Sequence, residues 1–101
     1  MANPRRINVP AETLRKLFND SGFWELAKQG ELLEKVYSEA PPQKRSGEPP
    51  GTLSQIVAYL DSQGRQVAIV HQYLRKDGSI GGSGRPDPKK LFYQGNVYVL
   101  R

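Results

Sequence analysis

Apolar residues recur at helical spacing in the first part of the chain. Residues 10–19 carry an apolar stripe formed by Leu14, Leu17 and Phe18, which predicts a short amphipathic helix. The same periodicity continues over 23–39, where Gly30 either splits the segment or allows close packing. Because only a short turn separates the two segments, we expect a helical hairpin over residues 10–39.

The next segment has the composition of a connector. Residues 40–51 hold four prolines and two glycines, which excludes a regular helix or strand. Paired prolines favour a stiff, extended chain. We therefore expect residues 40–52 to link the helices to a sheet.

Two apolar, β-prone runs follow and predict an antiparallel hairpin. They cover 53–60 and 65–75, and a type I turn with a glycine bulge between them would pair Asp61 with Arg65. The uninterrupted register then sets Tyr59 opposite Val67, Val57 opposite Ile69 and Gln55 opposite His71. A slip of one residue would exchange the two faces. Both faces are apolar near the turn, so we expect this end to be covered on both sides or to form an oligomer interface.

The last part of the chain is rich in glycine before it becomes apolar again. Residues 76–84 contain turns, Asp87 and Pro88 suit the start of a short helix over 87–93, and 97–101 has the pattern of a strand. Helices followed by strands indicate the α+β class. The predicted fold is one domain over 1–101. It has an N-terminal helical hairpin packed on an antiparallel sheet of three strands, or four, within 53–101.

The charge of the chain is unevenly distributed. The 101 residues include 15 basic and 10 acidic side chains, for a net charge of +5. Residues 1–50 hold eight basic and seven acidic side chains, or +1, whereas 51–101 hold seven and three, or +4. Since a positive field attracts phosphates, anionic lipid or acidic protein, we expect the working surface in the second half.

One group of candidate residues lies on the second strand of the hairpin. Strand alternation places His71, Tyr73 and Arg75 on one face. Histidine can accept a proton, arginine can stabilise charge on phosphate oxygens, and tyrosine can orient a ribose or stack on a base. The triple therefore suits cleavage of a phosphodiester. The alternative is a structural His71, partly buried and hydrogen-bonded to Gln55 or to the backbone.

The Gly-rich basic loop over 76–90 carries the second group. Repeated glycines let backbone N–H groups approach an anion, and the surrounding cations predict a phosphate-binding surface. Its expected residues are Arg75, Lys76, Arg85, Lys89 and Lys90, with Tyr93 as a stacking aromatic. The alternative is a long flexible loop between two strands.

Several classes of site and location are excluded by the residues that are present. The chain has no cysteine and one histidine, so neither a metal site nor a cofactor is expected. No run of about 18 apolar residues occurs, which excludes a transmembrane helix and leads us to expect no membrane partner. No apolar stretch follows Arg5 and Arg6, so we expect no secretory signal and a cytoplasmic location.

The order of the predicted elements resembles a known family. Helices followed by a sheet that carries His71, Tyr73 and Arg75 on one face are similar to the small bacterial ribonuclease toxins of the RelE and barnase–colicin type. The resemblance covers residues 10–101 and rests on the arrangement of elements. It implies metal-independent RNA cleavage by residues on the sheet, with His71, Tyr73 and Arg75 in these roles and Arg85 and Lys89 as further candidates for them.

Three functions are compatible with these patterns. The first is a small basic module that binds a phosphate-rich partner through residues 71–90, with RNA favoured over DNA. The second is a metal-independent ribonuclease toxin that uses His71, Tyr73 and Arg75. The third is a protein-interaction or accessory module that acts as a homodimer.

Overall fold

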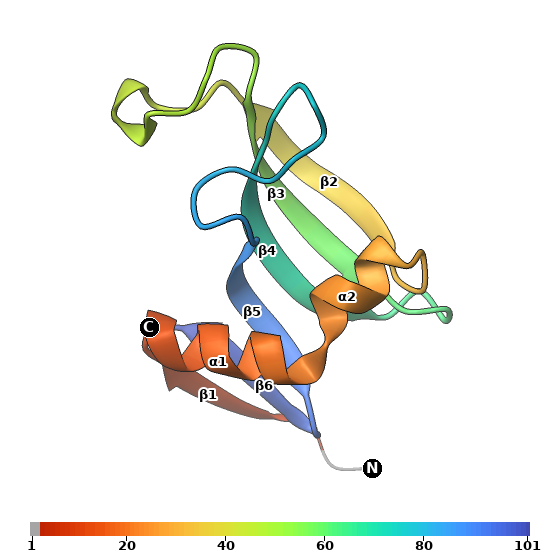
Figure 1. Cartoon of the computed structure of the whole chain (residues 1–101). Helices are drawn as coiled ribbons and strands as arrows, with labels where there is room; N and C mark the ends of the chain where they lie inside the picture. Colours follow the sequence, from red (N-terminus) through yellow and green to blue (C-terminus); the bar gives the residue numbers. More distant parts are fainter. Residues whose placement is uncertain (1–2) are drawn as a thin grey trace.

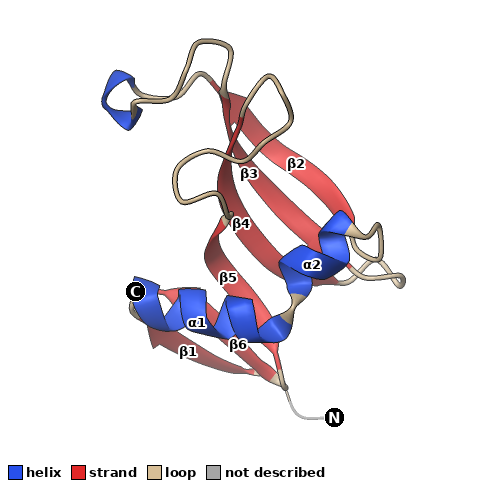
Figure 2. Cartoon of the chain, viewed as in Figure 1, coloured by secondary structure: helices blue, strands red, loops and turns tan. Residues whose placement is uncertain are grey.

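The chain forms one six-stranded sheet with two short helices on one of its faces, as a computed structural model describes it for residues 3–101 (Figures 1 and 2). The elements in chain order are β1 (Arg5–Val9), α1 (Ala11–Ser21), α2 (Phe23–Lys28), β2 (Leu33–Ala40), the 3-10 helix η1 (Lys44–Ser46), β3 (Leu53–Leu60), β4 (Gln66–Leu74), β5 (Asp87–Tyr93) and β6 (Asn96–Leu100). The strands lie in the order β1-β6-β5-β4-β3-β2. β1 runs parallel to β6 and the other neighbours are antiparallel, so the sheet is mixed.

The α+β class is correct, but the predicted helical hairpin on a three- or four-stranded antiparallel sheet is wrong. The first helix forms as α1, whereas the second ends at Lys28 as α2. Gly30 then adopts a left-handed φ of +78°, and the chain continues as β2 along the edge of the sheet. All eight residues of β2 are exposed. The apolar residues over 33–39 have helical spacing, which wrongly predicted a helix. Because β2 is exposed on both faces, its side chains need not alternate between apolar and polar, so the strand has no pattern in the sequence.

The first strand also departs from the prediction. β1 has only two apolar residues, Ile7 and Val9, and its partner β6 lies at the other end of the described chain. A run so short and so charged has no recognisable strand pattern on its own. Its parallel pairing with β6 is what makes the sheet mixed.

The short helix expected over 87–93 is a strand, β5, between β4 and β6. Pro88 lies opposite Val70, and Lys89 is left out of the ladder as a bulge. A proline without an N–H suits the first turn of a helix, but it is equally tolerated beside a bulge. Pairing along both edges and burial of Leu91 stabilise the extended form.

The hairpin of β3 and β4 is confirmed, and its turn has the predicted geometry. The backbone N–H of Asp61 donates to the Arg65 carbonyl at 2.8 Å. Gly64 has a φ of +76°, the left-handed conformation that a glycine bulge requires. The final predicted strand also forms, as β6.

The register of this hairpin changes soon after the turn. Val67 is left out of the ladder as a second bulge, and all pairs beyond it are displaced by one residue. His71 consequently lies opposite Ile56 instead of Gln55. The predicted pairs after the bulge are wrong. Beyond Val67, each residue of β4 shares a face with the β3 residues that were expected on the opposite face.

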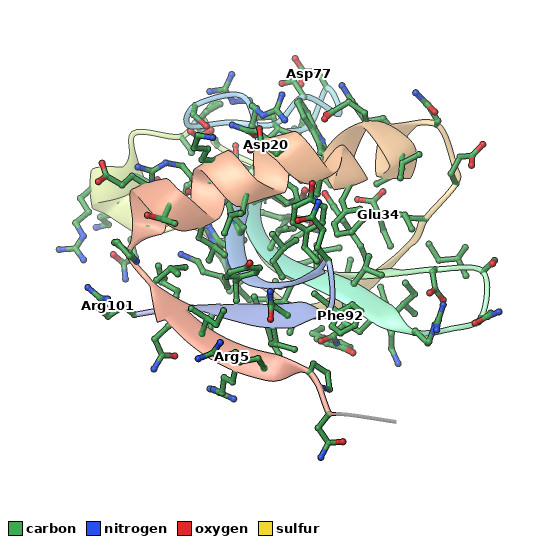
Figure 3. All side chains as sticks on the ribbon, turned by 90° about the horizontal axis from the view of Figure 1, so that it is seen from below. Arg5, Asp20, Glu34, Asp77, Phe92 and Arg101 are labelled. Carbon is green, nitrogen blue, oxygen red and sulfur yellow. The ribbon has the colours of Figure 1, made fainter. Side chains whose placement is uncertain are left out.

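The hydrophobic core lies between the helices and one face of the sheet. Leu14 and Phe18 of α1 are buried against β-strand residues that include Tyr59 and Leu91. The Phe18 and Tyr59 rings lie 6.2 Å apart. Because both helices lie on this side, as Figure 3 shows, the opposite face of the sheet has no helical cover.

Candidate nucleic-acid interface

The sheet face opposite the helices, here called the open face, is the best candidate for a functional surface. Its members alternate along each strand with residues of the core, so they point the other way. From β3 and β4 it receives Ile56, Ile69, His71 and Tyr73, all half-buried. The hairpin is thus covered by helices on one side only.

Cations lie across the whole width of the open face. Arg6 stands beside Val97 at one margin of the sheet, and Lys35 stands beside Ala58 at the other. Lys90 lies opposite Ile69 near the centre. With Lys89 in the adjacent bulge, the strands of this face carry four cations and one carboxylate, that of Asp87.

Aromatic rings lie among these cations. Phe92 is 41% exposed and Tyr37 is 50% exposed, both high values for large apolar side chains. The Lys35 ammonium lies 5.5 Å from the centroid of the Tyr37 ring. His71 and Tyr73 meet edge to face, with ring centroids 4.8 Å apart. The open face therefore offers both positive charge and accessible rings.

His71 lies in the middle of this surface and has a defined hydrogen-bond partner. A bond of 2.7 Å joins its Nε2 to Ser54 Oγ. Burial lowers the pKa of His71 below its usual value of 6.5, and the charge of Lys89 lowers it further, while Asp87 opposes them. Near neutral pH the ring is therefore uncharged. The expected structural partner, Gln55, lies on the other face because of the Val67 bulge.

This shift predicts that the protein loses stability as the pH falls below about 6.5. The unfolded chain takes up a proton at His71 before the folded protein does, so acidification favours unfolding until the lower folded pKa is passed. Urea unfolding at several pH values should show this loss in the wild type and a smaller loss in His71→Gln. Identical pH dependence in the two proteins would contradict the assignment.

The predicted anion site in the Gly-rich loop is already engaged by a carboxylate of the same chain. Glu48, whose side chain is 5% exposed, accepts a bond of 2.9 Å from Arg75 Nε and one of 3.0 Å from the Gly82 N–H. The hydrogen bond from Arg75 holds the pKa of the Glu48 carboxyl below its usual value. Arg75 follows the end of β4, and its guanidinium is paired with Glu48.

The remaining predicted residues divide between the two sides of the sheet. Lys89 and Lys90 join His71 and Tyr73, as expected. Arg85 lies on the helical side, where its guanidinium carbon is 4.3 Å from the Trp24 ring centroid. Tyr93 also lies there, edge to face with a ring of α2. Lys76 is exposed at the loop.

No protein-family model, curated protein or solved structure matches the chain. Within residues 3–101, neither helix has the length and apolar character needed to span a membrane. The helices-first order behind the resemblance to ribonuclease toxins also differs, since β1 precedes them.

Sequence reasoning missed four members of the open face: Arg6, Lys35, Tyr37 and Phe92. All four lie on strands that the sequence did not predict as strands: β1 was not expected, and β2 and β5 were expected to be helical. Residues 89–93 (KKLFY) do not alternate between polar and apolar side chains, so no strand pattern marks Lys90 and Phe92 as sharing a face.

Proposed function

We propose that this protein binds single-stranded nucleic acid, RNA in preference to DNA, across the open face. The observation that carries the proposal is the presence of four cations, one carboxylate and exposed rings on the strands of one surface. Cations neutralise phosphates, and aromatic rings stack on unpaired bases. RNA-recognition domains use an uncovered sheet in this manner.

The dimensions of the surface support a strand of several nucleotides. Six strands spaced about 4.8 Å apart give a width of roughly 24 Å. A nucleic-acid strand that crosses this width meets Arg6 and Lys35 at the margins, with Lys90, Phe92 and Tyr73 between them. Stacking on these rings requires unpaired bases, which favours single strands over a duplex.

Fluorescence anisotropy with labelled oligonucleotides tests this proposal directly. Single-stranded RNA should bind more tightly than single-stranded DNA of the same sequence, and both more tightly than an RNA duplex. Four phosphate contacts predict a slope of log K against log salt of roughly −3. If none of the three oligonucleotides shows salt-sensitive binding, the proposal is ruled out.

RNA cleavage is a second candidate, favoured by the environment of His71. Its uncharged ring contacts Tyr73 and hydrogen-bonds Ser54, and Lys89 is close enough to affect its titration. Lys89 would take the place expected for Arg75. Incubating the same RNA with the protein and a metal chelator should then give fragments that His71→Ala does not produce. If the RNA stays intact with the unmodified protein, cleavage is ruled out and binding remains the proposed function.

A further inference from the structure

A pocket lies where β4 and β5 separate, at the end of the sheet that carries the β3–β4 and β5–β6 turns. The ladder between β4 and β5 ends at the pair Ala68 and Leu91, although β4 begins two residues earlier and β5 continues for two more. Val67 has no partner in the ladder with β3 either, because it forms the bulge. The pocket between these separated segments has a volume of about 390 Å³, which is within the range of sites for small ligands.

The apolar lining of this pocket is mostly aromatic, and it continues onto the open face. Phe92 lines it from the open face, whereas Phe23 and Tyr93 line it from the helical side, where their ring centroids lie 6.2 Å apart. A smaller hollow, of about 150 Å³, shares Val67 and Phe92 with the pocket and is also lined by Lys90. A nucleic-acid strand bound near Lys90 can therefore place a base in the pocket without leaving the surface.

Arg65 supplies hydrogen-bond donors at the rim of the pocket. Its side chain is 73% exposed, and its Nε donates to Asp61 Oδ2 at 2.9 Å. This bond orients the guanidinium and leaves the N–H groups of its two terminal nitrogens for a ligand. The Asp61 carboxylate also balances the charge of Arg65, so a neutral base fits this rim better than a phosphate does.

Gln94 supplies an amide at the same rim, from the turn between β5 and β6. It is exposed, and its amide group offers both an acceptor and donors. Gln94 has a φ of +52°, and within residues 3–101 it is the one non-glycine residue with a left-handed backbone. Glycine adopts this conformation more easily, so the chain carries an amide side chain where the backbone favours none. Such positions are enriched at functional sites.

We propose that this pocket receives one unpaired purine base of the bound nucleic-acid strand. Arginine pairs with O6 and N7 of guanine, and glutamine pairs with N6 and N7 of adenine. Pyrimidines lack N7, and they offer less ring surface for stacking on Phe92. Arg65 thus suits guanine and Gln94 suits adenine, while both use the same edge of the purine. The inference rests on the proposed binding of single-stranded nucleic acid by the open face.

Fluorescence anisotropy with matched RNAs tests the pocket. A short oligouridine is compared with the same strand carrying one central adenosine or one central guanosine. At least one of these two should bind at least about fivefold tighter than oligouridine, and its 7-deaza analogue, which keeps the rings but lacks N7, should lose most of the gain. Equal affinity of the three strands, with binding that still depends on salt, would overturn the pocket and leave the open-face proposal intact. If none of the strands binds, both proposals fail.

Variants locate the purine gain in the pocket and identify the base. Gln94→Gly, which suits the left-handed backbone, should abolish a gain from adenosine, and Arg65→Met should abolish a gain from guanosine. Both should bind oligouridine within about twofold of the unmodified protein. Gln63→Gly and Arg45→Met remove the same groups from exposed positions outside the pocket and should keep the gain. Circular dichroism melting confirms that each variant is folded. A purine gain that survives in both pocket variants would overturn the proposal.

Discussion

Replacing Lys89 and Lys90 together by glutamate is expected to weaken binding of single-stranded RNA by at least about a hundredfold at moderate salt. The change removes two of the four cations of the open face and puts two negative charges at its centre. A factor of a hundred corresponds to about 2.8 kcal/mol, a modest sum for two lost phosphate contacts and new repulsion. The salt dependence should also become shallower, which anisotropy measurements at several salt concentrations will show.

A matched control separates this local effect from the overall charge of the protein. Arg15 and Lys16 are adjacent, exposed residues of α1 on the other side of the sheet. Replacing both by glutamate changes the net charge equally and should weaken binding only severalfold. Equal loss in the two double variants would show that net charge alone attracts the RNA. It would contradict an interface on the open face.

Alanine at position 81 is expected to lower the free energy of unfolding by about 1–3 kcal/mol, the usual cost of overpacking. A Cβ added to Gly81 would overlap the Glu48 carboxylate. Gly81 has no left-handed φ, so its backbone accepts alanine and the cost comes from this contact. Glu48 would have to move away from Arg75 and Gly82, which loosens the connector and the Gly-rich loop together. Urea unfolding measures the change.

The Glu48→Ala background identifies the origin of that cost. With the carboxylate removed, the same substitution at Gly81 should destabilise the protein much less. An equal cost in both backgrounds would mean that the conflict lies with the backbone or with other neighbours. The comparison therefore tests whether the Glu48 carboxylate holds the Gly-rich loop in place.

The sequence predicts local structure well where burial and turn chemistry agree. In α1, the apolar stripe at Leu14 and Phe18 faces the core, and the turn at Asp61 has its expected hydrogen bond. The Val67 bulge could not be foreseen, because a single residue left out of a ladder has no signature in the alternation of side chains. Because of this one residue, His71 lies on the same face as Ile56 and on the opposite face from Gln55.

The candidate site was predicted only where local strand alternation determines the positions of its residues. His71 and Tyr73 share a face in any regular strand, whatever its register, and the structure brings them into contact. Arg75 and Arg85 required tertiary information, since their positions depend on ion pairs with Glu48 and Glu25 from distant segments. Lys35 and Tyr37 needed the correct assignment of an exposed strand, which carries no pattern of burial.

The parallel pairing of β1 with β6 has a consequence for the order in which the protein is built. Residues 5–9 are synthesised before α1, but the strand that β1 pairs with comes only at residues 96–100. Until then β1 has no hydrogen-bonded neighbour, and the core under α1 lacks one side. Such a contact between distant segments slows folding. The β2–β4 region of the nascent protein can form first, whereas residues 5–9 stay unpaired until β6 has been synthesised.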